Sequence, residues 1–108
     1  MMTPTHNIVE LQLAVLEWAF ARQIVPNAKP HVQLMKAGAE LGELFDAEIK
    51  GDRAGIVDGI GDVLVTLIIY AELHGLTLAE CLGAAYNEIK DRKGILLPNG
   101  LFVKATNA

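Results

Sequence analysis

The sequence predicts an all-α fold: a four-helix bundle completed by a homodimer, with a short hairpin or extended tail at its C-terminal end. Four stretches carry apolar residues at intervals of three to four positions, as the buried face of a helix requires. Glycine or proline stands between these stretches. Apolar residues make up 52% of the 108 positions and aromatic residues only 6%, so the core must be mainly aliphatic. This length suits one domain, which we expect over residues 1–108.

The first helix is expected over residues 8–24. Its apolar positions have helical spacing: Ile8, Leu11, Val15, Leu16, Ala19 and Phe20. Trp18 and Arg22 are four positions apart and therefore share another side. Trp18 either fills a core or interface, or contacts a ligand. The segment 25–30 contains two prolines and ends this helix, and Pro30 suits the first turn of the next one.

The second helix is expected over residues 30–50, with Gly51 as its stop. Its apolar stripe consists of Leu34, Leu41, Phe45 and Ile49. Gly38 and Gly42 lie near this stripe, where small residues would let a neighbouring helix approach closely. We therefore expect this stripe to be a packed face.

A polar strip occupies another side of the same helix. At ~100° per residue, the strip falls within an arc of ~80° and comprises Gln33, Lys36, Glu40 and Glu43. A solvated face would have the same composition. However, Ala37, Leu44 and Ala47 flank the strip, whereas an exposed strip usually carries more charge. These neighbours favour a functional site.

The third helix is expected over residues 53–74, with Asp52 as N-cap and Gly75 beyond its end. One side is apolar throughout: Ile56, Ile60, Leu64, Leu67 and Ala71. The other side begins with two aspartates and continues with apolar residues: Asp58, Asp62, Val65, Ile69 and Leu73. A helix that is apolar nearly all round must be buried on every side. Because one short chain offers few covering helices, we expect a partner chain on the Val65 side.

The two acidic pairs are expected to meet. Glu40 and Glu43 are three apart, Asp58 and Asp62 are four apart, and the turn at 51–52 makes the two helices an antiparallel hairpin. Four converging carboxylates repel one another and lose hydration. A hard divalent cation relieves both costs, and oxygen ligands favour Mg²⁺, Mn²⁺ or Ca²⁺ over zinc.

A fourth helix is expected to open at a capping box, Thr77 to Glu80, and to run to about residue 93. Near its end lie an amide and three cations: Asn87, Lys90, Arg92 and Lys93. Cations at this position either bind phosphate or only offset the helix dipole. The tail, residues 95–103, places two apolar runs around a Pro-Asn-Gly turn and predicts a hairpin or an extended flap.

Several classes of protein are disfavoured. The net charge of −4 argues against binding of nucleic-acid polymers. The single cysteine, Cys81, cannot form an internal disulfide and fits a reducing, cytoplasmic location. No signal peptide is visible, and the uncharged run of residues 63–71 is too short to span a membrane. The three histidines are scattered, which argues against a di-iron carboxylate bundle.

These motifs together resemble a known family. Lys36, Glu40-x-x-Glu43, Asp58-x-x-x-Asp62 and Asn87-x-x-Lys90 are similar to the MazG-like branch of the all-α nucleoside triphosphate pyrophosphohydrolases. The closing run AYNEIKDRKG…NGLFVK resembles short bacterial and phage members, and the resemblance covers about residues 15–104.

The resemblance implies hydrolysis of a nucleoside triphosphate to the monophosphate and pyrophosphate, in the service of nucleotide-pool cleansing. It implies Mg²⁺, with Mn²⁺ as an alternative, and assembly as a homodimer or a dimer of dimers. The implied metal ligands are Glu40, Glu43, Asp58 and Asp62, with Glu40 or Glu43 activating water. The implied phosphate contacts are Lys36, Asn87, Lys90, Arg92 and Lys93, with Gln33 and Trp18 near the base or sugar.

Two departures from the family pattern stand out. Ala39 precedes Glu40 where many relatives have a second acid, and Gly59 stands where relatives have a glutamate, so Asp58 is one residue out of register. Two alternatives stay open: a phosphoribosyl-ATP pyrophosphohydrolase of the same fold, and a non-catalytic helical dimer whose acids hold a structural ion.

Overall fold

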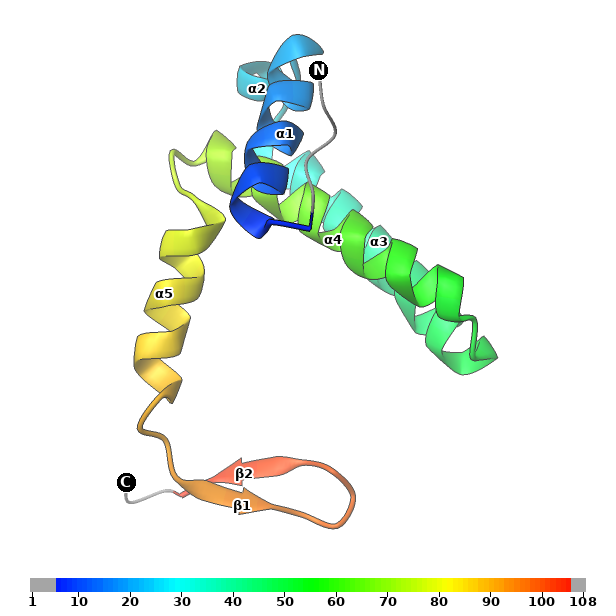
Figure 1. The fold of residues 1–108 in the computed structure, drawn as a ribbon, viewed down its shortest axis with the longest axis vertical. Coiled ribbons are helices and arrows are strands. Elements are labelled where there is room, and N and C mark those ends of the chain that lie inside the picture. Colours follow the sequence, from blue (N-terminus) through cyan, green and yellow to red (C-terminus); the bar gives the residue numbers. More distant parts are fainter. Residues whose placement is uncertain (1–5, 106–108) are drawn as a thin grey trace. The chain divides into compact units, whose positions relative to one another are not determined.

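The computed structural model describes residues 6–105 and divides into two compact units, Met1–Leu78 and Ala79–Ala108. The described part of the first unit contains four helices, α1 to α4 (Figure 1). The second unit contains most of helix α5 and a two-stranded hairpin. The all-α fold is thus confirmed, while a single domain over residues 1–108 stays a prediction.

The first predicted helix is shorter than expected. Helix α1 covers Ile8–Ala21, and Asn7 caps its start by accepting hydrogen bonds from the backbone N–H groups of Val9 and Glu10. Gln23 has a φ of 60°, a left-handed conformation that ends the helix before residue 24. A short helix α2, Ile24–Asn27, follows and contains the cis Val25–Pro26 bond.

The long antiparallel hairpin is confirmed. Helix α3 covers Pro30–Lys50 and α4 covers Arg53–Leu73, and the two lie side by side (Figure 1). Gly51 ends α3 with a φ of 64°, which an L side chain rarely adopts. The Asp52 carboxylate then accepts a hydrogen bond of 3.1 Å from Gly55 N–H and caps α4. A two-residue connection therefore fixes how the residues of the two helices face each other.

Close packing between α3 and α4 depends on glycines of α4. A Cβ atom added to Gly59 would lie 3.0 Å from Leu44 Cδ1, and one added to Gly55 would lie 3.1 Å from Ala47 Cβ. Gly38 and Gly42 take no part in this contact within the chain, because an added Cβ at either would meet nothing within 4 Å; their role in packing against another helix stays a prediction. The small residues that let the backbones of α3 and α4 approach each other are Gly55 and Gly59 of α4.

The packed side of α3 also differs from the prediction. Gln33, Ala37 and Ala47 are buried on the side toward α4. The large residues of the expected core stripe, here called the α3 stripe, are exposed in the single chain: Leu34, Leu41, Phe45 and Ile49. The chain packs its small residues internally and leaves its largest α3 side chains uncovered.

The second side of α4 is covered within the chain. Ile69 is 2% exposed and forms a core with Ala19 of α1 and Val25 of α2. Partly buried side chains surround this core: Val15, Ile24, Val65 and Leu73. The expectation that a partner chain covers the Val65–Ile69–Leu73 side was therefore wrong, since α1 and α2 fold back onto it.

In the second unit, α5 covers Leu78–Ile89 and ends four residues before the predicted end. Strands β1, Gly94–Leu96, and β2, Phe102–Lys104, pair antiparallel with Ile95 opposite Val103. The Asn99 side chain accepts a hydrogen bond from Leu101 N–H, and Gly100 has a φ of 90° in the turn. The hairpin alternative for the tail is confirmed.

By length and composition alone, α4 is apolar enough to cross a membrane, with a mean hydropathy of 1.8 over its most apolar 18-residue window. The core helix of a soluble protein passes the same test. Here α4 carries two aspartates and packs against α1, α2 and α3. We therefore interpret it as the central helix of the unit, and an absence of membrane contact stays a prediction.

Candidate active site

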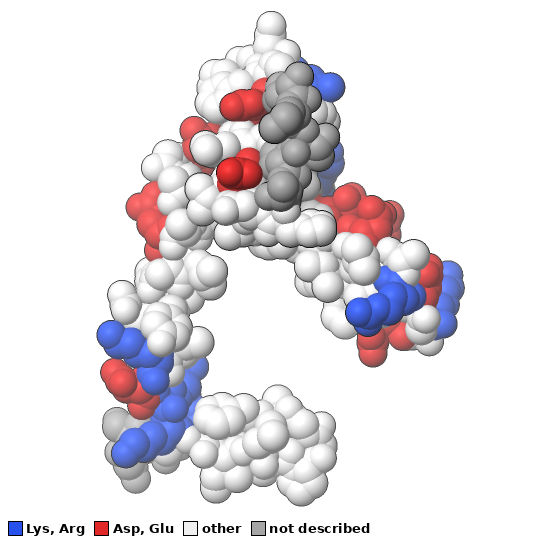
Figure 2. Space-filling view, viewed as in Figure 1, with Lys and Arg blue, Asp and Glu red and all other residues white. Residues whose placement is uncertain are grey.

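Acidic residues of both long helices line one pocket near the joined end of the hairpin. The pocket has a volume of about 220 Å³ and brings Glu43 of α3 together with Asp58 and Asp62 of α4. Acidic side chains gather over this hairpin in Figure 2. Three of the four predicted metal ligands thus share a pocket, although Asp58 is one residue away from the position that the resemblance implies for an acid.

The packing around Gly59 explains why the acid stands at position 58 and not at position 59. Gly59 is buried under Leu44, where a larger side chain would displace the neighbouring helix. The adjacent position, Asp58, is exposed and lines the pocket instead.

The fourth predicted ligand, Glu40, lies beside this group. It is half-buried, and the charges of Glu43 and Asp62 lie close enough to act on it. The pKa of Glu40 is raised above its ordinary value. Partial burial is the largest cause, followed by the negative charge and hydrogen bond of Glu43 and then by the charge of Asp62, whereas the Lys36 cation lowers the pKa. The acids are therefore close enough to repel one another, as the spacing predicted.

The donor set fits a hard divalent cation in chemistry. All four side chains offer carboxylate oxygens, and the repulsion recorded at Glu40 is the kind that a bound cation relieves. Among residues 6–105, no three acidic, histidine or cysteine side chains are already arranged as a coordination shell. The ligand roles of the four acids therefore stay predictions.

Two further charged residues of the pocket are not among the predicted ligands. Asp46 and Lys50 line it together with the predicted acids. They follow Glu43 by three and seven positions, so helical spacing alone would have placed them on its side. Lys50 supplies a cation at the acidic pocket, and Asp52 lines the pocket while capping α4.

The predicted phosphate-binding residues divide between the units. Lys36 lies close enough to Glu40 to lower its pKa. Asn87 lies in α5, whereas Lys90, Arg92 and Lys93 follow the helix end at Ile89, and all four are exposed. Figure 2 shows basic side chains at this end of α5. The position just beyond the helix C-terminus also fits the simpler role of offsetting the helix dipole.

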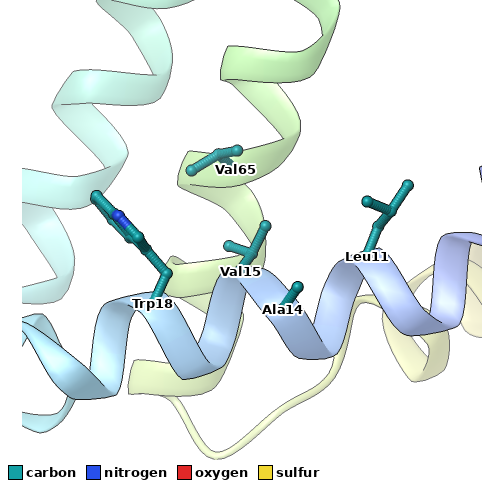
Figure 3. Close-up of a pocket in the computed structure, with 5 residues that line it drawn as sticks. All are labelled: Leu11, Ala14, Val15, Trp18 and Val65. Carbon is teal, nitrogen blue, oxygen red and sulfur yellow. The ribbon is translucent and has the colours of Figure 1, made fainter. Parts of the chain in front are cut away.

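The two residues expected near the base or sugar have different surroundings. Gln33 is 5% exposed, and its Oε1 atom has no hydrogen-bond partner among residues 6–105. Trp18 is 45% exposed, and the Arg22 guanidinium lies 4.6 Å from the centre of its ring. Trp18 also lines an apolar pocket between α1 and α4 (Figure 3).

The helix order, the α3–α4 hairpin and the acids that line it define a MazG-like all-α fold. Among solved structures, the chain is similar to a MazG-like pyrophosphohydrolase of cyanophage S-2L, which is bound to dGDP and three catalytic Mn²⁺ ions per active site. The TM-score is 0.64 and the identity 25%, over 94% of this chain and 99% of the phage protein. Comparisons with protein-family models and with curated proteins find no match. The predicted resemblance is thus confirmed at the level of the fold.

Proposed function

We propose that this protein is a Mg²⁺-dependent pyrophosphohydrolase that converts a nucleoside or deoxynucleoside triphosphate to the monophosphate and pyrophosphate. The observation that carries the proposal is the convergence of Glu43, Asp58 and Asp62 on one pocket, with Glu40 beside it. The phage neighbour of the same fold binds a nucleotide and Mn²⁺, which supports a nucleotide substrate and a divalent cation.

Divalent cations bound at these carboxylates would offset negative charge on the triphosphate and on the leaving pyrophosphate. Glu40 or Glu43 then orients the attacking water and accepts its proton. Asp58 and Asp62 complete the oxygen ligands from α4.

Cationic and amide groups provide contacts for the phosphates. Lys36 lies next to the acidic group and is placed to meet a phosphate oxygen there. Lys50, at the pocket wall, is a further candidate. Asn87, Lys90, Arg92 and Lys93 retain the phosphate-binding role that the family resemblance implies. Electrostatic attraction from these groups would offset the net negative charge of the chain.

The decisive experiment is a turnover screen of the eight common nucleoside and deoxynucleoside triphosphates and phosphoribosyl-ATP, with Mg²⁺ or Mn²⁺, measuring released pyrophosphate. We expect metal-dependent turnover of at least one triphosphate. Glu43→Gln is the matched control, since it keeps size and removes charge. Turnover of phosphoribosyl-ATP alone would favour the histidine-synthesis alternative, and no turnover of any compound would favour a structural ion site.

The proposal includes the assembly and location of the enzyme. We place it in the cytoplasm, where it acts on small nucleotides to cleanse the nucleotide pool, without binding membranes or nucleic-acid polymers. We propose a homodimer or a dimer of dimers in which the α3 stripe is covered by a second copy. The exposure of four large apolar side chains on one side of one helix supports this assembly.

A further inference from the structure

The apolar side of α5 has no cover in the single chain. It is formed by Leu82, Tyr86 and Ile89, which are 67%, 59% and 50% exposed. At ~100° per residue these side chains fall within an arc of ~60°, and no residue of α5 is buried. An amphipathic helix gains most of its stability by packing its apolar side, so α5 requires a surface on which to lie.

The α3 stripe is a second uncovered surface, and a helix can lie close to it. Around α3, Gly38 falls within ~40° of both Leu34 and Phe45, near the middle of the stripe. A Cβ atom added to Gly38 or Gly42 would meet nothing within 4 Å, so the space above both glycines is open. Glycines between large side chains let the backbone of another helix approach, which suits the stripe for helix packing.

The charges beside the two surfaces have opposite signs. Asp46 and Glu48 are exposed, and helical spacing places them on opposite edges of the α3 stripe. Lys90, Arg92 and Lys93 are exposed just beyond the last residue of α5. A contact between two copies of the stripe would bring the acids of both copies together, whereas α5 brings cations to these acids. Electrostatics therefore favours α5 as the cover of the stripe.

The area of the two surfaces matches what a stable dimer needs. Taking roughly 200 Å² for a fully exposed large side chain, one α3 stripe and one apolar side of α5 would together bury about 800 Å². Twofold symmetry repeats the contact, and the total of roughly 1,600 Å² is a standard interface size. Two stripes packed on each other would bury only about 950 Å², which is below the usual range for stable interfaces.

We propose that the apolar side of α5 packs on the α3 stripe of a second copy, and that the α5 of the second copy makes the same contact in return. The inference rests on the homodimer of the proposed function, names both of its contact surfaces, and does not depend on catalysis. It gives Gly38 and Gly42, which touch nothing within the chain, a packing role between chains.

A crosslink from α5 tests which surface lies against it. Cys81 is the single cysteine, is exposed and directly precedes Leu82, so a thiol-reactive benzophenone attaches to the full-length chain at one position of α5. After irradiation, a crosslink between chains doubles the mass on a denaturing gel, whereas one within a chain keeps the mass of one chain. We expect doubled mass, and peptides of α3 as the crosslinked partners in mass spectrometry.

Variants on both surfaces test the packing itself, with sedimentation equilibrium as the measurement. Gly38→Leu should keep the helical spectrum, since the space is open within the chain, yet raise the Kd of the dimer at least about tenfold by holding α5 away. Leu82→Glu should do the same from the other surface.

Two matched controls carry the same substitutions elsewhere and should leave the dimer unchanged. Gly83→Leu fills an equally open position of α5 that lies ~100° from Leu82 and outside the apolar side. Leu13→Glu changes a leucine of α1 that is 55% exposed and belongs to neither surface.

Four results would overturn the inference. Crosslinks within one chain would mean that α5 covers its own α3, and crosslinks to the α5 of a second copy would mean that two α5 helices pair. A Gly38→Leu dimer as tight as the wild type would exclude close packing over the glycines, and a monomeric wild type would exclude the contact altogether. Turnover by such a monomer would leave the proposed activity standing. A dimer with the expected crosslinks but no turnover of any nucleotide would refute that activity and support the contact.

Discussion

Substitution of Leu41 by glutamate should dissociate the proposed dimer. Leu41 lies in the α3 stripe, whose members Leu34, Leu41, Phe45 and Ile49 are 47%, 45%, 62% and 82% exposed in the single chain. Complete burial of such a side chain is worth roughly 1.5–3 kcal/mol, so each member still has about 1–2 kcal/mol to gain from a partner. The glutamate would place a carboxylate without a partner in this contact, once from each copy.

The size of the stripe decides whether a stable dimer is expected. Two copies would gain roughly 8–16 kcal/mol from the eight stripe side chains. Association itself costs about 4–15 kcal/mol, so the stripe can hold a dimer when other apolar residues add to it. Ile60 on α4 is 50% exposed and is one such residue. Losing two leucine contacts and burying two charges would then make the dimer undetectable at micromolar concentration.

The matched control is Val32→Glu. Val32 lies on the same helix and is 46% exposed, against 45% for Leu41, but the nine-residue separation places it on the opposite side of α3. Sedimentation velocity over micromolar concentrations measures the assembly, and circular dichroism checks that the helices persist. We expect the wild type and Val32→Glu to be dimers or tetramers and Leu41→Glu to be a monomer. A monomeric wild type, or equal behaviour of the two variants, would refute the interpretation of the stripe.

Four further predictions follow from the first unit and from the end of α5. Glu43→Gln and Asp62→Asn should each abolish Mg²⁺-dependent turnover while the helical spectrum is kept; full activity of either variant would contradict the assigned site. Lys90→Ala should weaken triphosphate binding more than metal binding in calorimetric titrations, and an unchanged nucleotide affinity would leave it only a role at the helix dipole. Ile69→Glu should lower the free energy of unfolding by several kcal/mol, measured by urea denaturation, because Ile69 of α4 is buried against α1 and α2; near-native stability would contradict this packing. The pKa of Glu40 is raised above its ordinary value of 4.5, so the folded state binds more protons than the unfolded state. The metal-free protein should therefore lose stability as pH rises above about 4.5, and Glu40→Gln should reduce that loss in melting curves recorded with chelator. A difference in stability between this variant and the wild type that does not change with pH would refute the prediction.

Local signals in the sequence were sufficient to predict the long hairpin. Gly51 and Asp52 end one helix and begin the next through a left-handed φ and a side-chain cap, and both effects depend only on neighbouring residues. Once this turn is known, the spacings of Glu40, Glu43 and Asp62 bring them together. The acidic site was predictable because it depends on helical spacing and one short connection.

Tertiary structure decided which helix faces are buried. The α3 stripe has the larger side chains, yet α3 packs through its small side toward α4, because Gly59 leaves room for Leu44 and Gly55 leaves room for Ala47. Periodicity identifies an apolar face but does not say which surface will cover it, since that depends on backbone approach between two elements.

The covering of Ile69 also depended on contacts that are distant in sequence. Gln23 turns the chain in a left-handed conformation, α2 follows, and Ala19 and Val25 close over the second side of α4. The same return of α1 places Trp18 and Val65 on one apolar pocket. The sequence by itself determined the helices and the four acids. The fold decided which surfaces remain exposed and which side chains line the apolar pocket, because both depend on side chains brought together from separate helices.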